Sequence, residues 1–387
     1  MTLTVNRMRL HVLVERSLQE NPITALLGPR QSGKTHLSRL LGAEPANCFD
    51  LENFSDLTRL QDDAMTALGR LSGLVIIDEV QWMPELFPLL RVLADRPGLP
   101  ARFLLLGSAS PELVKGSSES LAGRVSFIDM AGLHLGEVNA ADYENLWLRG
   151  GLPRSFLAVS AEASLRWRLD YVRTFIERDL RALAETKMSS ADLRRLLLML
   201  ADSHGQPWNN SDAARTLGVN YKTIQRHVDL LCGAFILREL PPHLANVRKR
   251  LRKSSKYYFR DSGLLHALLA LPSVERLQAY RGQGASWEGF ALEQLVRVLE
   301  LREEECFNYA VQEGAEMDLV VRRPRGLVGF EFKAGAVPRV TTSMIHSIAD
   351  IGLEHVWVVY PGTRDFPLGD KIDAIGITNL GRLIDLV

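Results

Sequence analysis

Short apolar runs, each followed by glycine or polar residues, recur through the first third of the chain. Residues 23–27, 74–77 and 102–106 have the length and the largely apolar character of strands buried on both faces. Residues 36–41 continue from the first run with helical spacing. This alternation of strands and helices predicts an open α/β sheet within residues 1–145.

Helical periodicity dominates the middle of the chain. Apolar residues recur at i, i+3, i+4 and i+7 between residues 155 and 205, and we interpret residues 146–200 as a helical lid. Two further amphipathic stretches follow, with a tight turn at 218–220 between them. Residues 201–275 therefore indicate a winged helix-turn-helix domain.

The last part of the chain, residues 276–387, has a mixed pattern and predicts a second α/β domain. We expect a helix, a strand hairpin with a Pro-Arg-Gly turn, another helix and another strand, at residues 284–301, 316–323 with 327–335, 343–353 and 355–362.

The loop after the first strand has the sequence GPRQSGKT, which matches G-x-x-x-x-G-K-[ST] in the strand–loop–helix context of a P-loop. Its backbone N–H groups and the start of the helix favour phosphate oxygens. Lys34 is expected to reach the β- and γ-phosphates, and Thr35 to bind Mg²⁺. The predicted nucleotide site comprises Gly28, Pro29, Arg30, Gln31, Ser32, Gly33, Lys34, Thr35 and His36.

Polar residues end the other two strands, at the edge where open α/β sheets bind ligands. Asp78 and Glu79 end the second strand, and Ser108 ends the third. We expect Asp78 to hold Mg²⁺, Glu79 to polarise the attacking water and Ser108 to sense the γ-phosphate. ATP and Mg²⁺ are thus the predicted cofactors.

Composition narrows the class of protein. The 387 residues allow two or three domains, and the zero net charge means that nucleic-acid binding requires a local basic patch. Three cysteines without ligand spacing oppose a disulfide framework or a zinc site. No apolar run reaches the roughly 18 residues of a membrane helix. We expect a cytoplasmic protein with no membrane partner.

The sequence contains one local basic patch. No acidic residue lies between Pro241 and Arg260, and this stretch can be drawn as the two strands of a wing, with the turn at 252–256. It contains seven cations: Arg248, Lys249, Arg250, Arg252, Lys253, Lys256 and Arg260. The preceding helix begins with Lys222, Thr223, Gln225 and Arg226. These residues predict contacts with the DNA backbone, and a protein-binding winged helix is the alternative.

The order of the P-loop, DEVQ (78–81), LLGSAS (105–110) and SLAGRV (120–125) resembles a family of bacterial and archaeal AAA-type ATPases. Their C-terminal region was long labelled a domain of unknown function. The resemblance extends through WLRGGLP (147–153), FIERDL (175–180) and KYYFRDSGLLHALL (256–269). It implies that Arg124 acts as a finger in a neighbouring subunit of a homo-oligomer such as a ring, and that Arg154 is a sensor in the lid. The alternative for each arginine is a structural ion pair.

The C-terminal pattern resembles the restriction-endonuclease-like core called PD-(D/E)XK. Glu331 and Lys333 match its E-x-K element, Asp318 its acidic position, and Glu288, or alternatively Glu293, its helix carboxylate. This resemblance implies a second Mg²⁺ or Mn²⁺ site. Met317 replaces the proline of the namesake motif, and Ala310 an arginine of many relatives, so a nuclease fold kept for binding is also open.

Together these features predict a Mg²⁺-dependent AAA-type ATPase that acts on DNA in repair, recombination or remodelling of branched DNA. Two alternatives remain: an ATP-dependent regulatory switch with a protein or operator partner, and an ATP-gated, metal-dependent endonuclease.

Overall fold

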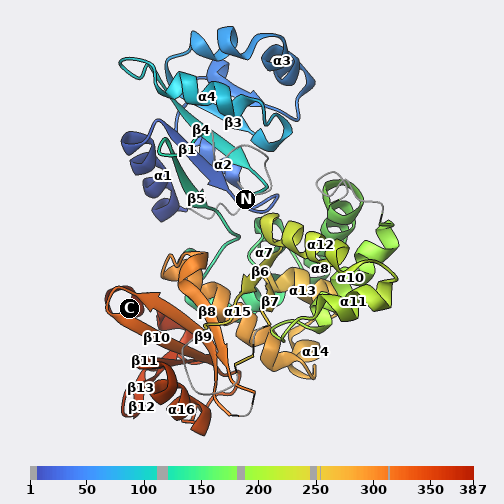
Figure 1. The fold of residues 1–387 in the computed structure, drawn as a ribbon, viewed down its shortest axis with the longest axis vertical. Coiled ribbons are helices and arrows are strands. Elements are labelled where there is room, and N and C mark those ends of the chain that lie inside the picture. The colour runs from blue at the N-terminus through green and yellow to red at the C-terminus, as the bar shows by residue number, and fades with distance from the viewer. Residues whose placement is uncertain (1–6, 111–120, 181–187, 245–250, 253, 313) are drawn as a thin grey trace. The chain divides into compact units, whose positions relative to one another are not determined.

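The computed structural model describes residues 7–110, 121–180, 188–244, 251–252, 254–312 and 314–387 (Figure 1). The chain folds into two compact units. Unit 1 contains Met1–Gly132 and Leu230–Ile236, and unit 2 contains Leu133–Asp229 and Leu237–Val387. Unit 2 thus holds nearly all of the predicted lid, helix-turn-helix and C-terminal regions, whose separate boundaries remain predictions.

A parallel sheet forms the centre of unit 1, with the strand order β2-β3-β4-β1-β5. Its strands are β1 Ile23–Leu27, β2 Cys48–Asp50, β3 Gly73–Asp78, β4 Ala101–Gly107 and β5 Val125–Asp129. The helices are α1 Met8–Glu20, α2 Lys34–Arg39, α3 Phe54–Gly69 and α4 Leu86–Ala94. The predicted open α/β sheet is confirmed.

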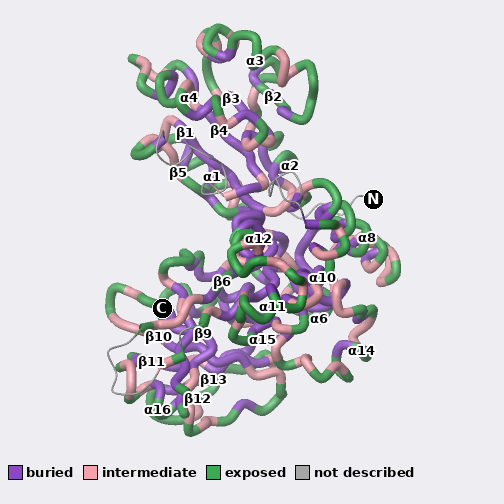
Figure 2. Tube along the Cα trace, turned by 45° about the vertical axis from the view of Figure 1, so that its right-hand side comes forward, coloured by how far each residue is buried: buried purple, intermediate pink, exposed green. Residues whose placement is uncertain are grey.

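Burial explains why the apolar runs of unit 1 are strands. Every residue of β1 is buried, and β3 and β4 are buried over most of their length (Figure 2). Covered on both faces, such strands need continuous apolar sequence. Because all five strands are parallel, their carboxyl ends meet at one edge, which positions the site described below.

The first part of unit 2 is helical. Its helices are α6 Tyr143–Arg149, α7 Pro153–Phe156, α8 Ala161–Thr174, α10 Ser190–Asp202, α11 Asn210–Leu217, α12 Tyr221–Gly233, α13 Ser262–Leu268 and α14 Val274–Gln278. The part of α12 from Leu230 on is assigned to unit 1. The chain continues from α8 into the π-helical turn Phe175–Leu180. Gly218 ends α11 with φ 66°, so a left-handed residue separates α11 from α12, as the predicted tight turn at 218–220 requires.

A two-stranded antiparallel sheet follows, formed by β6 Leu237–Leu240 and β7 Lys256–Phe259. The partner of β7 therefore precedes the basic stretch. Our prediction that both wing strands lie inside that stretch is wrong. The apolar alternation of LREL is too short to identify β6 from sequence.

The C-terminal part of unit 2 is a six-stranded mixed sheet with the order β12-β13-β11-β10-β9-β8. Its strands are β8 Cys306–Ala310, β9 Glu316–Arg323, β10 Gly326–Phe332, β11 Leu353–Tyr360, β12 Phe366–Gly369 and β13 Ile372–Gly376. Its helices are α15 Gln283–Val298 and α16 Thr342–Ile351. The predicted helices and the β9–β10 hairpin are confirmed, and the two edge strands and β13 were missed.

One core of unit 2 surrounds α15 and includes Trp147 and Trp287, whose rings meet edge to face. A polar chain crosses it. The indole of Trp147 donates 3.0 Å to the Ser286 hydroxyl, which lies 2.7 Å from Nε2 of His266. Nδ1 of His266 lies 3.0 Å from the carbonyl of Leu148. Among the described residues, no helix is both long and apolar enough to span a bilayer.

This environment predicts a pH-dependent contribution to stability. Burial lowers the pKa of His266 from 6.5 to about 4. The unfolded chain therefore binds the proton first, and the stabilisation present above pH 6.5 is lost as pH falls toward 4. We expect the advantage of the wild type over His266→Gln in unfolding free energy to shrink by about 1 kcal/mol per pH unit over this range.

Urea unfolding at several pH values measures this difference, and comparison with the variant removes the contributions of other titrating groups. An advantage that stays constant from pH 6.5 to 4 contradicts a neutral, buried His266.

Candidate functional site

The P-loop of unit 1 connects β1 to α2 and is shaped by its glycines. Gly33 has φ 101°, and a Cβ on Gly28 would overlap the carbonyl oxygen of Met130. Both positions therefore require glycine. The hydroxyl of the buried Ser32 has no hydrogen-bond partner among the described residues. A cradle with a free buried hydroxyl fits the phosphate oxygens of a nucleotide.

Lys34 folds back onto this loop. Its Nζ donates 2.8 Å to the carbonyl of Gly28 and 3.0 Å to that of Pro29. Burial lowers the pKa of Lys34 to about 8, although Glu79 and Asp78 oppose the effect. A bound phosphate would place a negative charge beside the buried ammonium of Lys34 and so stabilise its charged form.

Thr35 and Asp78 meet across the sheet edge. The Thr35 hydroxyl donates 2.6 Å to Oδ2 of Asp78. Burial raises the pKa of Asp78, and the hydrogen bond from Thr35 acts against it. A hydroxyl and a carboxylate brought together at this edge are the ligands that P-loop proteins offer to Mg²⁺, so the predicted residues fit that ion.

Glu79 and Ser108 are also brought together, and Gln81 joins them. The Ser108 hydroxyl donates 3.0 Å to Oε2 of Glu79 and accepts from Nε2 of Gln81 at 3.0 Å. The same amide nitrogen also donates to Glu79. The sequence reasoning missed Gln81. The feature that could have identified Gln81 is its position, because it places a side-chain amide two residues after Glu79.

Arg30 is a second neighbour of Glu79. Its guanidinium forms an ion pair with Glu52 and lies 4.0 Å from Oε1 of Glu79. The predicted P-loop residue therefore also contacts the carboxylate expected to act on water. Pro29, Gln31 and His36 remain predicted nucleotide contacts through their place in or beside the loop.

Arg124 is not part of this assembly. The amide of Ile23 donates to its carbonyl, so Arg124 lies where β1 and β5 begin, about 16 Å of strand away from the P-loop. Its side chain donates 2.7 and 2.9 Å to Asp95. A finger directed at a neighbouring subunit stays a prediction. Arg154 belongs to α7 of unit 2, and its sensor role also stays a prediction.

Unit 2 contains a second group of ionisable side chains, which we call the acidic cluster. It comprises Glu288 of α15, Glu316 and Asp318 of β9, and Glu331 of β10. Burial and the charge of Asp318 raise the pKa of both Glu288 and Glu331. Asp318 therefore lies close enough for its charge to act on both Glu288 and Glu331.

Two lysines complete the surroundings of this cluster. Nζ of Lys333 lies 2.6 Å from Glu331, and Nζ of Lys256 lies 2.8 Å from Glu316 and 3.6 Å from Glu288. Among the described residues, no three acidic, histidine or cysteine side chains converge as metal ligands. The implied second Mg²⁺ or Mn²⁺ site thus does not fit this arrangement.

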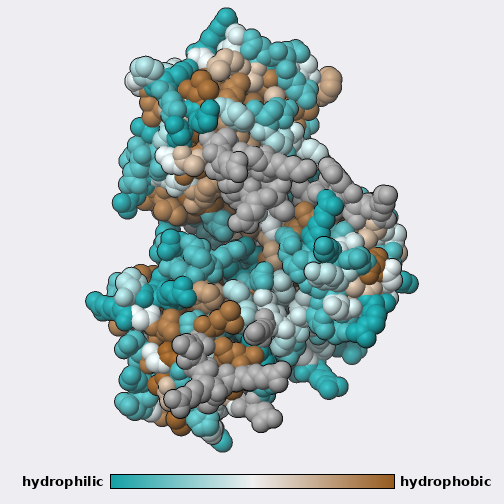
Figure 3. Space-filling model, viewed as in Figure 1, coloured by the Kyte–Doolittle hydropathy of each residue, from teal (hydrophilic) through white to brown (hydrophobic). Residues whose placement is uncertain are grey.

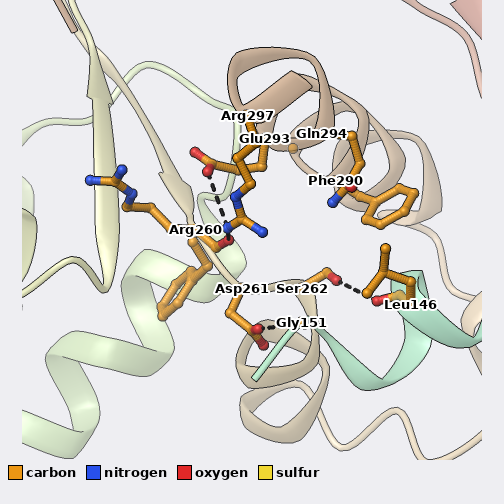
Figure 4. A pocket seen from close by; sticks show the side chains of 11 residues that line it. Leu146, Gly151, Arg260, Asp261, Ser262, Phe290, Glu293, Gln294 and Arg297 are labelled. Carbon is orange, nitrogen blue, oxygen red and sulfur yellow. Dashed lines mark hydrogen bonds and ion pairs between the residues drawn. The ribbon is translucent and has the colours of Figure 1, made fainter. Parts of the chain in front are cut away.

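Glu293, the alternative helix carboxylate, faces a different group. It pairs with Arg238, and its Oε2 lies 3.3 Å from Nη2 of Arg297, one turn along α15 (Figure 4). The two residues are five positions apart on α15, so Glu288 and Glu293 point to different sides of the helix. Glu293 as a metal ligand is therefore wrong.

The predicted DNA-contacting residues divide into four groups, the last of which is the buried Lys256. Lys222, Arg226 and Arg252 are exposed, and hydrophilic side chains prevail over α10 and α11 in the face shown in Figure 3. Thr223 is half-buried, and the amide of Gln225 donates 2.6 Å to Asp229. Arg248, Lys249, Arg250 and Lys253 lie outside the described residues.

Two of the predicted cations are buried. Lys256 is 4% exposed and lies in the acidic cluster, and Arg260 is 8% exposed and pairs with Glu303 at 3.1 Å. Neither belongs to an exposed phosphate-binding surface, so Lys256 as a DNA contact is wrong. Their positions in the sequence gave no sign of this, because a basic run does not reveal which members have acidic partners.

Comparisons with known proteins give three family matches. An AAA domain matches residues 20–139, and two domains of unknown function match residues 140–275 (DUF8612) and 283–380 (DUF4143).

Individual proteins are similar over more of the chain. The uncharacterized proteins Rv2008c of Mycobacterium tuberculosis and Mb2031c of Mycobacterium bovis are each 47% identical over 363 residues, covering 94% of this chain and 81% of theirs. A solved structure, the Walker-type ATPase PABY2304 of Pyrococcus abyssi, is 15% identical, covers 69% of this chain and 96% of its own, and has a TM-score of 0.49. The chain therefore belongs to the same family as the two mycobacterial proteins, and its AAA domain, over residues 20–139, is that of a P-loop ATPase.

Proposed function

We propose that the protein hydrolyses ATP in a Mg²⁺-dependent reaction at the carboxyl edge of the unit 1 sheet. The observation that carries this is the convergence of Lys34, Thr35, Asp78, Glu79 and Ser108 from three separate segments. Thr35 and Asp78 would hold Mg²⁺, which supplies charge neutralisation for the transferred phosphoryl group. Lys34 binds the terminal phosphates, Glu79 orients the attacking water, and Ser108 contacts the γ-phosphate.

Phosphate release from ATP, measured with Mg²⁺ and again with excess EDTA, tests this function. The wild type should turn over only with the metal, and Lys34→Ala should lose both ATP binding and turnover. Arg70→Ala, an exposed cation at the end of α3, is the matched control. Turnover that survives both EDTA and Lys34→Ala would contradict the proposed site.

Gln81 has a positioning role in this reaction. Its amide holds the Glu79 carboxylate and the Ser108 hydroxyl at the same time, which fixes the distance between the water-orienting group and the γ-phosphate contact. Gln81→Leu should therefore lower kcat by about tenfold and leave the Kd for ATP nearly unchanged.

A double-mutant cycle with Ser108→Ala distinguishes this role from simple loss of stability. The two substitutions should cost less together than the sum of their separate effects, since both break the same unit. Gln19→Leu, an exposed glutamine on α1, is the control. Fully additive losses of kcat refute the coupling.

DNA is the proposed target of this ATPase. Three exposed cations support this proposal. Lys222 and Arg226 lie on α12, the second helix of the proposed helix-turn-helix, and Arg252 follows β6 in the chain. Contacts of this kind with phosphates are independent of base sequence. Repair, recombination or remodelling of branched DNA are the settings we propose, with an oligomer as the working form.

The proposal predicts a measurable effect of α12 on DNA affinity. Lys222→Ala/Arg226→Ala should weaken binding to duplexes of any sequence and reduce the slope of log K against log salt by about 2. The charge-matched control is Arg276→Ala/Arg281→Ala, two exposed arginines in and after α14. Equal affinities for the two double variants would remove α12 from the interface.

The same ATPase assay with duplex, single-stranded and branched DNA separates the alternatives. Turnover stimulated by DNA that stays intact supports the proposed function. Slow turnover that is indifferent to DNA supports the regulatory switch. Cleavage that is lost in Asp318→Ala supports the ATP-gated nuclease.

A further inference from the structure

Lys256 is the first residue of β7 and lies inside the acidic cluster of unit 2. Its side chain is 6% exposed, and Nζ contacts the carboxylates of Glu316 and Glu288. A buried ammonium has lost its hydration and requires acidic partners to remain charged. Burial by itself lowers the pKa of Lys256, but Glu288, Asp318 and Glu316 outweigh it and raise the pKa. The ammonium is thus a charged member of the cluster.

The backbone holds this ammonium in place. Lys256 pairs with Leu240 of β6 and forms a bridge with Pro207 on its other side. Two residues along the same strand, the Tyr258 hydroxyl donates 2.5 Å to Glu288. Lys256 and Tyr258 share one face of β7, so the strand delivers two donors to the cluster together.

The connection between β6 and β7 is also fixed to the C-terminal sheet. The amide of His243 donates 2.6 Å to the carbonyl of Asn308, and the Asn308 side chain donates 2.6 Å to that of Leu240. The amide of Arg252 donates 2.9 Å to the carbonyl of Ala310. Both ends of this connection therefore run along the edge strand β8. Withdrawing Lys256 would break backbone hydrogen bonds.

The charges of the cluster favour an internal cation over a metal ion. Four carboxylates face two ammonium groups, and the outer one, Lys333, is 38% exposed. A divalent ion needs several carboxylate oxygens at about 2.0–2.6 Å and repels an ammonium beside it. The ammonium of Lys256 already occupies the position between the carboxylates of Glu288 and Glu316.

We infer that Lys256 is the built-in cation of the acidic cluster, and that its ammonium replaces the divalent metal implied by the nuclease-like resemblance. The cluster then fastens the β6–β7 pair to the six-stranded sheet. The inference does not depend on the ATPase reaction, and it predicts that the C-terminal domain has no metal-dependent cleavage of its own.

Cation rescue tests this assignment with the full chain in the absence of nucleotide. Without metal, Lys256→Ala should lower the melting temperature by about 5 °C, because the carboxylates lose their inner counter-ion. Millimolar Mn²⁺ should restore most of that loss. Neither the wild type nor Lys256→Arg should be stabilised, and Lys256→Ala/Asp318→Asn should not be rescued.

Electron paramagnetic resonance of Mn²⁺ measures binding directly, and Lys256→Ala should bind it about tenfold more tightly than the wild type. Wild-type binding as tight as that of Lys256→Ala, and lost in Asp318→Asn, overturns the inference. If Lys256→Ala does not fold, Asp318→Asn alone decides: equal Mn²⁺ binding by this variant and the wild type supports the inference, and weaker binding by the variant refutes it.

Discussion

Glu79→Gln should bind ATP with the affinity of the wild type and hydrolyse it about 100- to 10,000-fold more slowly. The reason is the geometry of the carboxylate. Glu79 follows β3 with φ 55°, which turns its side chain along the sheet edge toward Ser108, 3.0 Å away. Glutamine keeps the size and the hydrogen bonds of this side chain but cannot accept a proton from water.

Single-turnover hydrolysis and equilibrium binding of a fluorescent ATP analogue measure the two quantities separately. Glu85→Gln, an exposed glutamate six residues further along the chain, is the control and should change neither. A Glu79→Gln protein with normal turnover would assign the attacking water to another group. A protein that no longer binds ATP would show that Glu79 shapes the site itself.

Glu293→Gln should lower the free energy of unfolding of unit 2 by about 3–5 kcal/mol. Arg238 and Glu293 are each at most 3% exposed, and Arg297 also contacts Glu293. Burial alone would raise the pKa of Glu293, but Arg238, Arg260 and Arg297 lower it to about 2. Figure 4 shows Glu293 and Arg297 facing each other. Removing the negative charge takes away the buried counter-ion of these guanidinium groups and leaves, among the described residues, only the exposed Glu303 beside Arg238.

Urea unfolding followed by circular dichroism measures this loss. Glu304→Gln provides the control, since Glu304 forms an exposed pair with Arg302 and should cost less than about 1 kcal/mol. The double variant Arg238→Met/Glu293→Met should recover much of the stability, because apolar side chains need no counter-ion. A loss for Glu293→Gln no larger than that of Glu304→Gln contradicts the network.

The nucleotide site was largely predictable from sequence because its parts are local. A P-loop is a continuous segment, and Asp78, Glu79 and Ser108 are found by their positions at strand ends. Parallel strands then bring those ends to one edge without further information. Gln81 was missed because its role depends on a hydrogen bond to Ser108, 27 residues away in the chain.

In unit 2, the sequence predicted regular elements but not the partners of charged side chains. Helices α11, α12 and α15 and the β9–β10 hairpin follow from periodicity. The same basic run that suggested DNA binding contains Lys256, which is buried in the acidic cluster, and Arg252, which is exposed. Nothing local distinguishes these two cations, since only their distant neighbours differ.

Sequence by itself thus determined the class of the first domain, its nucleotide loop and most regular elements, since each of these depends on residues close together in the chain. Tertiary structure alone decided which charges pair. It directed Lys256 to Glu316 and Glu293 to Arg238, and it placed Arg124 at the opposite end of β1 from the P-loop. The physical reason is that Coulombic interactions act across space, and a linear pattern does not record which buried charges share a site.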